Sequence, residues 1–195
     1  MKRRQVGYSL VEVLIAMAIT SVVLLTVVTL FYMGQRNVYS GKQMTYAVSV
    51  GTRILEDLSS MTANDVETNF NVDDSTTLTS VPLYGVSLPS GLTIPNSALV
   101  DTTGCTGSGS PVVWTCTNDP NGYLAKWKGL IDESKLANAT VGLVLTPTDP
   151  ANPSTCPNCP WTTARFLKIR AFVRWDEAKN RQRIAFFDTT RTNRD

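Results

Sequence analysis

A long uncharged segment near the N-terminus constrains this 195-residue chain more than any other feature. No charged residue lies between Glu12 and Arg36, and the uncharged run over residues 13–35 contains 23 residues. As an α-helix, that run would be about 35 Å long, which is enough to cross the roughly 30 Å hydrocarbon core of a bilayer. We therefore predict a membrane-spanning helix over residues 8–35.

Basic residues precede the apolar segment and set its expected orientation. Lys2, Arg3 and Arg4 should stay in the cytoplasm, so the rest of the chain should lie across the membrane. An ordinary secretory signal peptide is the alternative, because the small-x-small tripeptide at residues 16–18 has the form of its cleavage site. That tripeptide lies inside the apolar run instead of after it, which argues against cleavage there.

Glu12 is the one acidic residue close to this run. A carboxylate inside an apolar span costs at least ~2.5 kcal/mol on insertion scales, so such a residue is usually paired and functional. Alternatively, Glu12 lies at the headgroup boundary, where it would cost little. The combined arrangement of a basic leader, Gly7, the aromatic Tyr8 and Glu12 favours a functional role.

The segment Gly7-Tyr8-Ser9-Leu10-Val11-Glu12-Val13-Leu14-Ile15-Ala16 resembles the class III signal of type IV prepilins and type II secretion pseudopilins. This resemblance implies that a prepilin peptidase cuts between Gly7 and Tyr8, and that Tyr8 is then N-methylated. It also implies that Glu12, the fifth residue of the mature chain, acts in assembly. The family more often has Phe at the position of Tyr8, which is a mild departure.

The chemistry of these residues agrees with the implied roles. Gly7 has no side chain, so it fits a tight cleavage pocket and permits an extended backbone. A buried carboxylate needs an opposite charge. By the resemblance, Glu12 meets the new amino group of a neighbouring subunit, which favours lateral association and sets axial register. Before cleavage, Tyr8 has no free amine with which Glu12 could pair.

Helical periodicity continues beyond the apolar run, so we predict one helix over residues 9–61. Its second part, residues 36–61, is amphipathic, with apolar residues at helical spacing: Ala47, Val50, Ile54, Leu55, Leu58 and Met61. Polar residues are expected on its other faces: Arg36, Lys42, Gln43, Arg53, Glu56 and Asp57. Gly34, Gly41 and Gly51 each weaken the helix by ~1 kcal/mol relative to Ala and mark bends or close helix approach. No proline precedes Pro82, which favours a minor pilin or pseudopilin by the resemblance.

The remaining residues, 62–195, predict a small antiparallel α+β head. Residues 62–82 and 147–160 read as loops, and residues 139–145 read as a strand. Alternation predicts a β-hairpin from strands over residues 166–175 and 182–188. One face of its first strand is apolar and should face the core: Leu167, Ile169, Ala171, Val173 and Trp175. This hairpin resembles the C-terminal hairpin of PilV-type minor pilins.

All four cysteines follow the predicted membrane segment and should therefore face an oxidising compartment. They allow three disulfide pairings, of which pairing by sequence neighbours, Cys105–Cys116 and Cys156–Cys159, is favoured. Cys156 and Cys159 also form a CxxC motif, but prolines surround it and no helical pattern follows, which argues against redox catalysis. A four-cysteine zinc site would need two close pairs, and the spacing between Cys105 and Cys116 is too long.

Several other function classes are excluded or disfavoured. The chain has no histidine, which excludes histidine-based metal sites and His-dependent catalysis. No nucleotide loop or nucleophile–base set is evident, so we predict neither an enzyme nor a cofactor. The net charge of +2 excludes a strongly basic nucleic-acid binder. Basic residues of the hairpin could still bind DNA, but a solvated face or a contact with an acidic neighbouring subunit is favoured for them: Lys168, Arg170, Arg174, Arg181 and Arg183.

The sequence thus predicts a leader at residues 1–7, a membrane or filament-core helix at 8–35, its amphipathic continuation at 36–61, and a head at 62–195. The expected protein is a minor type IV pilin-like subunit that takes part in assembling or priming a filament. The expected partners are other pilin or pseudopilin subunits, prepilin peptidase and, before assembly, the bacterial inner membrane. The expected final location is a pilus or a periplasmic pseudopilus. The alternatives are a minor pseudopilin of type II secretion or DNA uptake, and a membrane-anchored thiol or metal protein.

Overall fold

A computed structural model of the chain describes residues 9–72, 77–78, 80–81, 86–87, 94–95, 97–117, 119–149, 160–161, 164–177 and 181–192. The chain divides into two compact units, the first ending at Lys42 and the second beginning at Gln43. The long helix α1, Leu10–Ser59, contributes residues to both units. The fold is α+β, with a long N-terminal helix and a four-stranded antiparallel sheet, as the sequence predicts.

The first part of α1 is apolar and uncovered. Every residue over 9–39 is exposed, and the most apolar 18-residue window of α1 has a mean hydropathy of 2.7. Among the described residues, α1 is the one helix that is long and apolar enough to cross a membrane. The helix begins and ends within two residues of the predicted limits.

The second part of α1, from Gln43 onward, packs within the second unit. Its buried residues lie on one face of the helix: Gln43, Ala47, Val50, Gly51, Ile54 and Leu58. The predicted apolar stripe is therefore confirmed, except that Leu55 is only half-buried. The prediction that Gln43 lies on a polar face is wrong, because Gln43 is one turn before Ala47 and shares its buried face.

Two contacts fix this part of α1 against the rest of the second unit. A Cβ atom at Gly51 would overlap the ring of Phe187, so the helix backbone approaches that aromatic side chain directly. On another face, the Asp57 carboxylate accepts hydrogen bonds from Trp127 Nε1 at 2.9 Å and Lys126 Nζ at 2.6 Å. An aromatic contact and a charged hydrogen-bond pair thus set the position of the helix.

The main sheet contains four antiparallel strands in the order β10-β9-β8-β5. Their bounds are Ala98–Asp101 for β5, Thr140–Thr148 for β8, Phe166–Glu177 for β9 and Arg181–Thr192 for β10. The predicted hairpin is β9–β10, with Ala185 opposite Val173. All five residues predicted to face the core from β9 are buried, which confirms the alternation.

Strand β8 extends further than predicted. Pro147 was assigned to a loop, but it pairs with Leu167 of β9 inside the strand. Strand β5 pairs with β8 only from Gly142 to Leu145, so Pro147 lies where β8 has become an edge strand. A proline is tolerated there because an edge position does not need both sets of backbone hydrogen bonds.

A short helix, α2 (Ala63–Phe70), replaces the loop predicted for residues 62–82 over its first part. Thr62 is the N-cap: its hydroxyl accepts a hydrogen bond from Asp65 N at 3.2 Å, and Asp65 accepts one from Thr62 N at 2.8 Å. These hydrogen bonds lower the pKa of Asp65 below its ordinary value. This capping box and the buried Val66 and Phe70 account for the helix.

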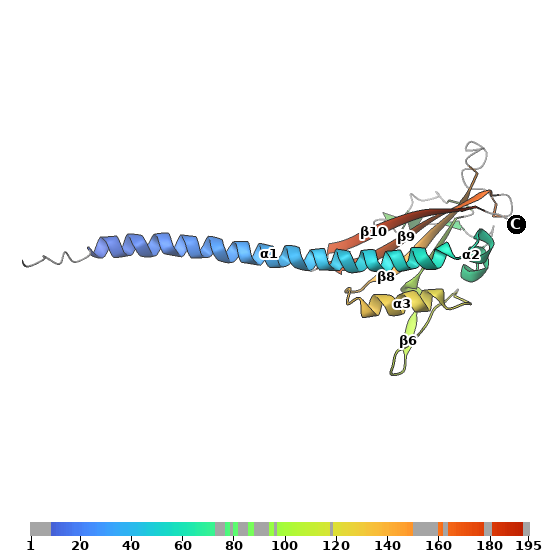
Figure 1. Ribbon diagram of the computed structural model, residues 1–195, viewed down its shortest axis with the longest axis horizontal. Coiled ribbons are helices and arrows are strands. Elements are labelled where there is room, and N and C mark those ends of the chain that lie inside the picture. The colour runs from blue at the N-terminus through green and yellow to red at the C-terminus, as the bar shows by residue number, and fades with distance from the viewer. Residues whose placement is uncertain are drawn as a thin grey trace, which may run out of the picture. The chain divides into compact units, whose positions relative to one another are not determined.

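A third helix, α3 (Tyr123–Glu133), was not predicted from the sequence. It buries Leu124, Trp127 and Ile131, which are spaced by three and four residues and so share one face. Gly122 at its N-cap offers no side chain, and Asp119 instead accepts a hydrogen bond from Ala125 N at 2.8 Å. Figure 1 shows α2 and α3 beside the end of α1 that belongs to the second unit.

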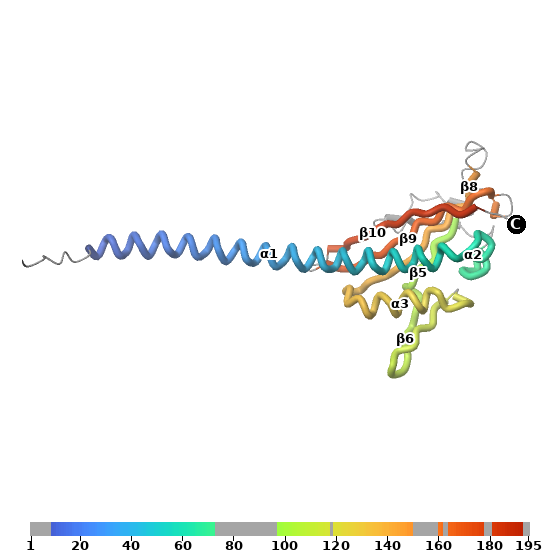
Figure 2. The backbone as a smooth tube through the Cα atoms, in the orientation of Figure 1, coloured from blue at the N-terminus to red at the C-terminus, as the bar shows by residue number. Residues whose placement is uncertain are grey.

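The remaining described elements are short. The 3-10 helix η1 (Thr102–Gly104) leads into a hairpin formed by β6 (Thr106–Ser108) and β7 (Val113–Thr115). Figure 2 shows the backbone leaving β5, forming this hairpin and returning into α3. Four two-residue strands make two further small sheets: β1 (Thr77–Leu78) with β4 (Ile94–Pro95), and β2 (Ser80–Val81) with β3 (Val86–Ser87).

Candidate assembly site

The candidate site begins at the first turn of α1, where Glu12 lies. The Ser9 carbonyl accepts hydrogen bonds from Glu12 N at 2.9 Å and from Val13 N at 3.2 Å, and these bonds close the first turn. Glu12 is exposed there, at the positive end of the helix dipole, which favours a negative charge. The predicted cleavage residues, Gly7 and Tyr8, lie outside the described residues.

Glu12 has no ion-pair partner among the residues that the structure describes. Its side chain borders a shallow hollow on the helix surface. The other residues that line this hollow are Val13, Ala16, Met17, Thr20 and Ser21. The next charged residue along the chain is Arg36, about 36 Å away along the helix axis at ~1.5 Å per residue. A counter-charge for Glu12 must therefore come from outside this stretch of helix.

Hydroxyl groups on the apolar part of α1 are satisfied by the helix itself. Each donates to a backbone carbonyl three or four residues earlier, at 2.7–2.8 Å: Thr20 to Ala16, Ser21 to Met17, Thr26 to Val23 and Thr29 to Leu25. A hydroxyl bonded in this way needs no water, so the helix can enter an apolar environment without unpaired donors.

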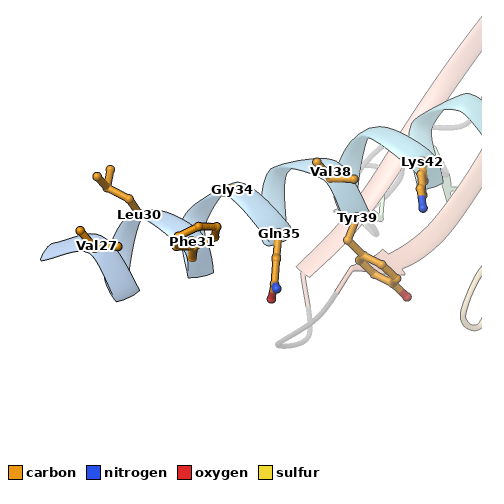
Figure 3. A pocket seen from close by; sticks show the side chains of 8 residues that line it. All are labelled: Val27, Leu30, Phe31, Gly34, Gln35, Val38, Tyr39 and Lys42. Atoms are coloured by element: carbon orange, nitrogen blue, oxygen red, sulfur yellow. The ribbon is translucent and has the colours of Figure 1, made fainter. Parts of the chain in front are cut away.

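A second hollow lies further along α1 and is centred on Gly34. Figure 3 shows Gly34 without a side chain among larger neighbours. The lining is mostly apolar, with Gln35 and Lys42 as its polar members: Val27, Leu30, Phe31, Gly34, Gln35, Val38, Tyr39 and Lys42. The sequence singled out Gly34 as a weak point of the helix and as a point of bending or close helix approach, but it did not predict this hollow.

The cysteines of the second unit are partly described. Cys105 and Cys116 form a disulfide that closes the base of the β6–β7 hairpin. Cys156 and Cys159 lie outside the described residues. The disulfide sulfurs cannot act as thiolate metal ligands, and within the described part of the chain no three His, Cys, Asp or Glu residues cluster as a metal site would require.

The five basic residues predicted on the hairpin are mostly engaged within the chain. Arg170 donates two hydrogen bonds to Asp188, at 2.7 and 2.9 Å, which lower the pKa of Asp188 and raise that of Arg170. Arg181 and Arg183 both pair with the buried Glu177, at 3.3 and 3.1 Å. These three arginines are therefore partly neutralised by carboxylates of the same chain.

Comparison with known proteins gives one match. Residues 2–28 match the family model of the prokaryotic N-terminal methylation motif. No curated protein and no solved structure matches the chain. The matched stretch contains the basic leader, Glu12 and the first hollow of α1. The chain therefore carries the N-terminal methylation motif of type IV pilin-like proteins.

Proposed function

We propose that this protein is a minor type IV pilin-like structural subunit that takes part in assembling or priming a filament. The match of residues 2–28 to the methylation motif carries this proposal. The geometry supports it, because an exposed apolar helix begins with a carboxylate that lacks a partner in the described residues. A subunit built in this way gains stability when neighbouring subunits cover the helix and supply a positive charge.

Processing turns the precursor into an assembly-competent subunit. Prepilin peptidase cleaves after Gly7, and the amino group formed on Tyr8 is then N-methylated. The carboxylate of Glu12 pairs with the amino group of an adjacent subunit, which retains its positive charge after methylation. Before cleavage the Tyr8 nitrogen is part of a neutral amide, so an uncleaved precursor lacks this charge.

Membrane insertion comes before assembly. The apolar part of α1 anchors the subunit in the bacterial inner membrane in a single pass, and the head lies outside the cytoplasm. The subunit then moves into a pilus or a periplasmic pseudopilus. The Cys105–Cys116 disulfide supports this topology, because disulfides persist in oxidising compartments.

A minor pseudopilin of type II secretion or DNA uptake is the second candidate. Helix α1 contains no proline over residues 10–59 and so has no proline kink. This feature favours a minor pilin and a pseudopilin equally, so it does not distinguish the two candidates. Both candidates use the same N-terminal motif. Loss of the gene distinguishes them, since a minor pilin should affect surface filaments and a pseudopilin should affect secretion or DNA uptake.

Replacing Glu12 by Gln tests the proposed role of its charge. The variant keeps the size of the side chain but cannot form the ion pair, so we expect at least roughly a tenfold loss of subunit from sheared filaments. Immunoblots of filament and membrane fractions measure this loss. Glu56→Gln is the matched control, because Glu56 is an exposed carboxylate on the same helix. Normal incorporation of the Glu12 variant would contradict the proposal.

A further inference from the structure

Two cations in the first unit of α1 have no carboxylate near them on the helix. Arg36 and Lys42 are both exposed, and neither takes part in an ion pair among the described residues. No acidic residue lies between Glu12 and Glu56, so the nearest carboxylate along the helix is about 21 Å from Lys42 at ~1.5 Å per residue. Neighbours three or four positions away therefore cannot neutralise these charges.

Tyrosines flank the two cations at helical spacing. Tyr39 lies three positions after Arg36 and three positions before Lys42, and Tyr32 lies four positions before Arg36. Residues at these spacings are neighbours on a helix surface. Both tyrosines are mostly exposed, at 61% for Tyr32 and 55% for Tyr39. We call these four residues, Tyr32, Arg36, Tyr39 and Lys42, the aromatic–basic stripe.

The aromatic–basic stripe lies where the uncharged run ends. Gln35 is the last residue of that run, so both cations follow the segment expected in hydrocarbon. Figure 3 shows the side chains of Gln35, Tyr39 and Lys42 on the same side of α1. The two cations are about 9 Å apart along the helix axis. The polar headgroup layer on each side of a bilayer is about 5–8 Å thick, so the stripe covers this layer at the end of the span.

Each side chain of the stripe suits the headgroup layer. Tyrosine is enriched at membrane–water interfaces, because its ring is apolar and its hydroxyl is polar. The guanidinium of Arg36 can donate paired hydrogen bonds to phosphate oxygens, and the ammonium of Lys42 can bind phosphate as a point charge. Two cations without a carboxylate attract a partner of net negative charge, so an anionic headgroup fits them better than a zwitterionic one.

We infer that the aromatic–basic stripe binds the headgroups of anionic phospholipids while the subunit is in the membrane. Arg36 and Lys42 pair with the lipid phosphates, and the tyrosines lie at the same level with their hydroxyls toward the headgroups. This contact sets the depth of α1 in the bilayer. The inference rests on the proposed membrane placement of α1, and it adds a class of ligand to the segment that follows the span.

Lipid retention by the full chain tests this binding. The protein is purified in a neutral detergent and mixed with phosphatidylglycerol or with phosphatidylcholine of the same acyl chains, and native mass spectrometry counts the lipids that stay bound. We expect at least roughly tenfold greater retention of phosphatidylglycerol, because each cation at the headgroup layer adds to the attraction. High salt should reduce this preference, since ions screen the attraction between exposed charges.

Charge variants locate the binding on the helix. The double variant Arg36→Gln with Lys42→Gln should retain at least roughly tenfold less phosphatidylglycerol, whereas the exchange Arg36→Lys with Lys42→Arg should keep it. Arg53→Gln is the matched control, because Arg53 is exposed on the same helix and forms no ion pair among the described residues. Every variant keeps the leader cations and therefore the same background. Normal formation of the Cys105–Cys116 disulfide would show that the head still folds.

Four results would overturn the inference. Equal retention of the two lipids would show that the chain does not recognise the headgroup charge. Unchanged retention in the double variant would place the lipid elsewhere, and an equal loss in Arg53→Gln would show a general effect of charge. Displacement of the lipid by inorganic phosphate would show a site for the free anion instead of a membrane headgroup.

The assay separates this inference from the proposed function, because it requires neither processing nor a filament. Selective retention by a protein that still begins at Met1 in its native membrane would support the inference and contradict the proposed function. Loss of selectivity in a protein that begins at Tyr8 would overturn the inference alone.

Discussion

Two parts of one helix carry similar apolar side chains in opposite environments. Ile19, in the first unit, is 61% exposed, whereas Ile54, in the second unit, is fully buried. In the second unit, the sheet and α3 cover the apolar stripe, and Asp57 finds its donors on α3. In the first unit, Glu12 and the hollow at Gly34 have no such cover among the described residues. Helical periodicity therefore identifies an apolar face that is expected to be buried. It does not show whether the same chain or another molecule buries that face.

The largest expected effect comes from truncating the same residue type in both parts. Ile54→Ala should lower the free energy of unfolding of the head by about 2–5 kcal/mol, because it leaves a cavity in the core. Ile19→Ala should change it by less than about 0.5 kcal/mol. Denaturant unfolding in detergent, followed by tryptophan fluorescence, measures both changes, since all four tryptophans follow residue 100. Equal losses would show that the exposed part of α1 also stabilises the head.

Replacing a glycine by alanine should also have different effects on stability in the two parts of α1. Gly51→Ala should destabilise the head by about 1–3 kcal/mol, because its Cβ atom overlaps the Phe187 ring. Gly41→Ala should cause no loss and should raise helix stability by up to ~1 kcal/mol, because a Cβ atom there meets open space. Thermal unfolding followed by circular dichroism compares the two variants. A neutral Gly51→Ala would mean that Phe187 moves aside without cost.

The smallest expected effect concerns charges that are paired within the head. Hydrogen bonds from Arg170 hold the pKa of Asp188 below its ordinary value, so this pair stabilises the fold at neutral pH. The stabilisation should disappear as the pH falls through the lowered pKa and the carboxylate gains a proton. Both side chains are partly exposed, at 36% and 49%, so Asp188→Asn should cost only about 0.2–1 kcal/mol at neutral pH.

Denaturant unfolding of the wild type and Asp188→Asn at several pH values measures this pair. The difference between the two proteins should shrink toward zero in acid. Arg170→Gln should show the same loss and the same pH dependence. A difference that stays constant with pH would show that the aspartate acts by packing instead of by charge.

Sequence patterns predicted the elements that have strong periodicity. The stripe from Ala47 to Leu58 and the alternation along β9 gave the long helix and the C-terminal hairpin, because burial on one face imposes those periods. Helix α2 was missed although the Thr62–Asp65 capping box is visible in the sequence. Helix α3 was missed because Gly122 gives no N-cap signal, although Leu124, Trp127 and Ile131 have helical spacing.

Other features depend on contacts that sequence spacing does not encode. Gln43 is buried by tertiary packing in the second unit, whereas its polar side chain predicted an exposed position. The requirement for glycine at Gly51 depends on Phe187, which is 136 positions later in the chain. The assembly residues were predicted at Gly7, Tyr8 and Glu12 from a local motif, and the first two lie outside the described residues.

The most direct test of the account is the N-terminus of the protein isolated from its native membrane. Intact mass and N-terminal sequencing together determine where the chain begins and whether that residue carries a methyl group. The account predicts a chain that begins with N-methylated Tyr8. A chain that still begins at Met1, or one that begins beyond Met17, would contradict prepilin processing and with it the proposed role of Glu12 in assembly.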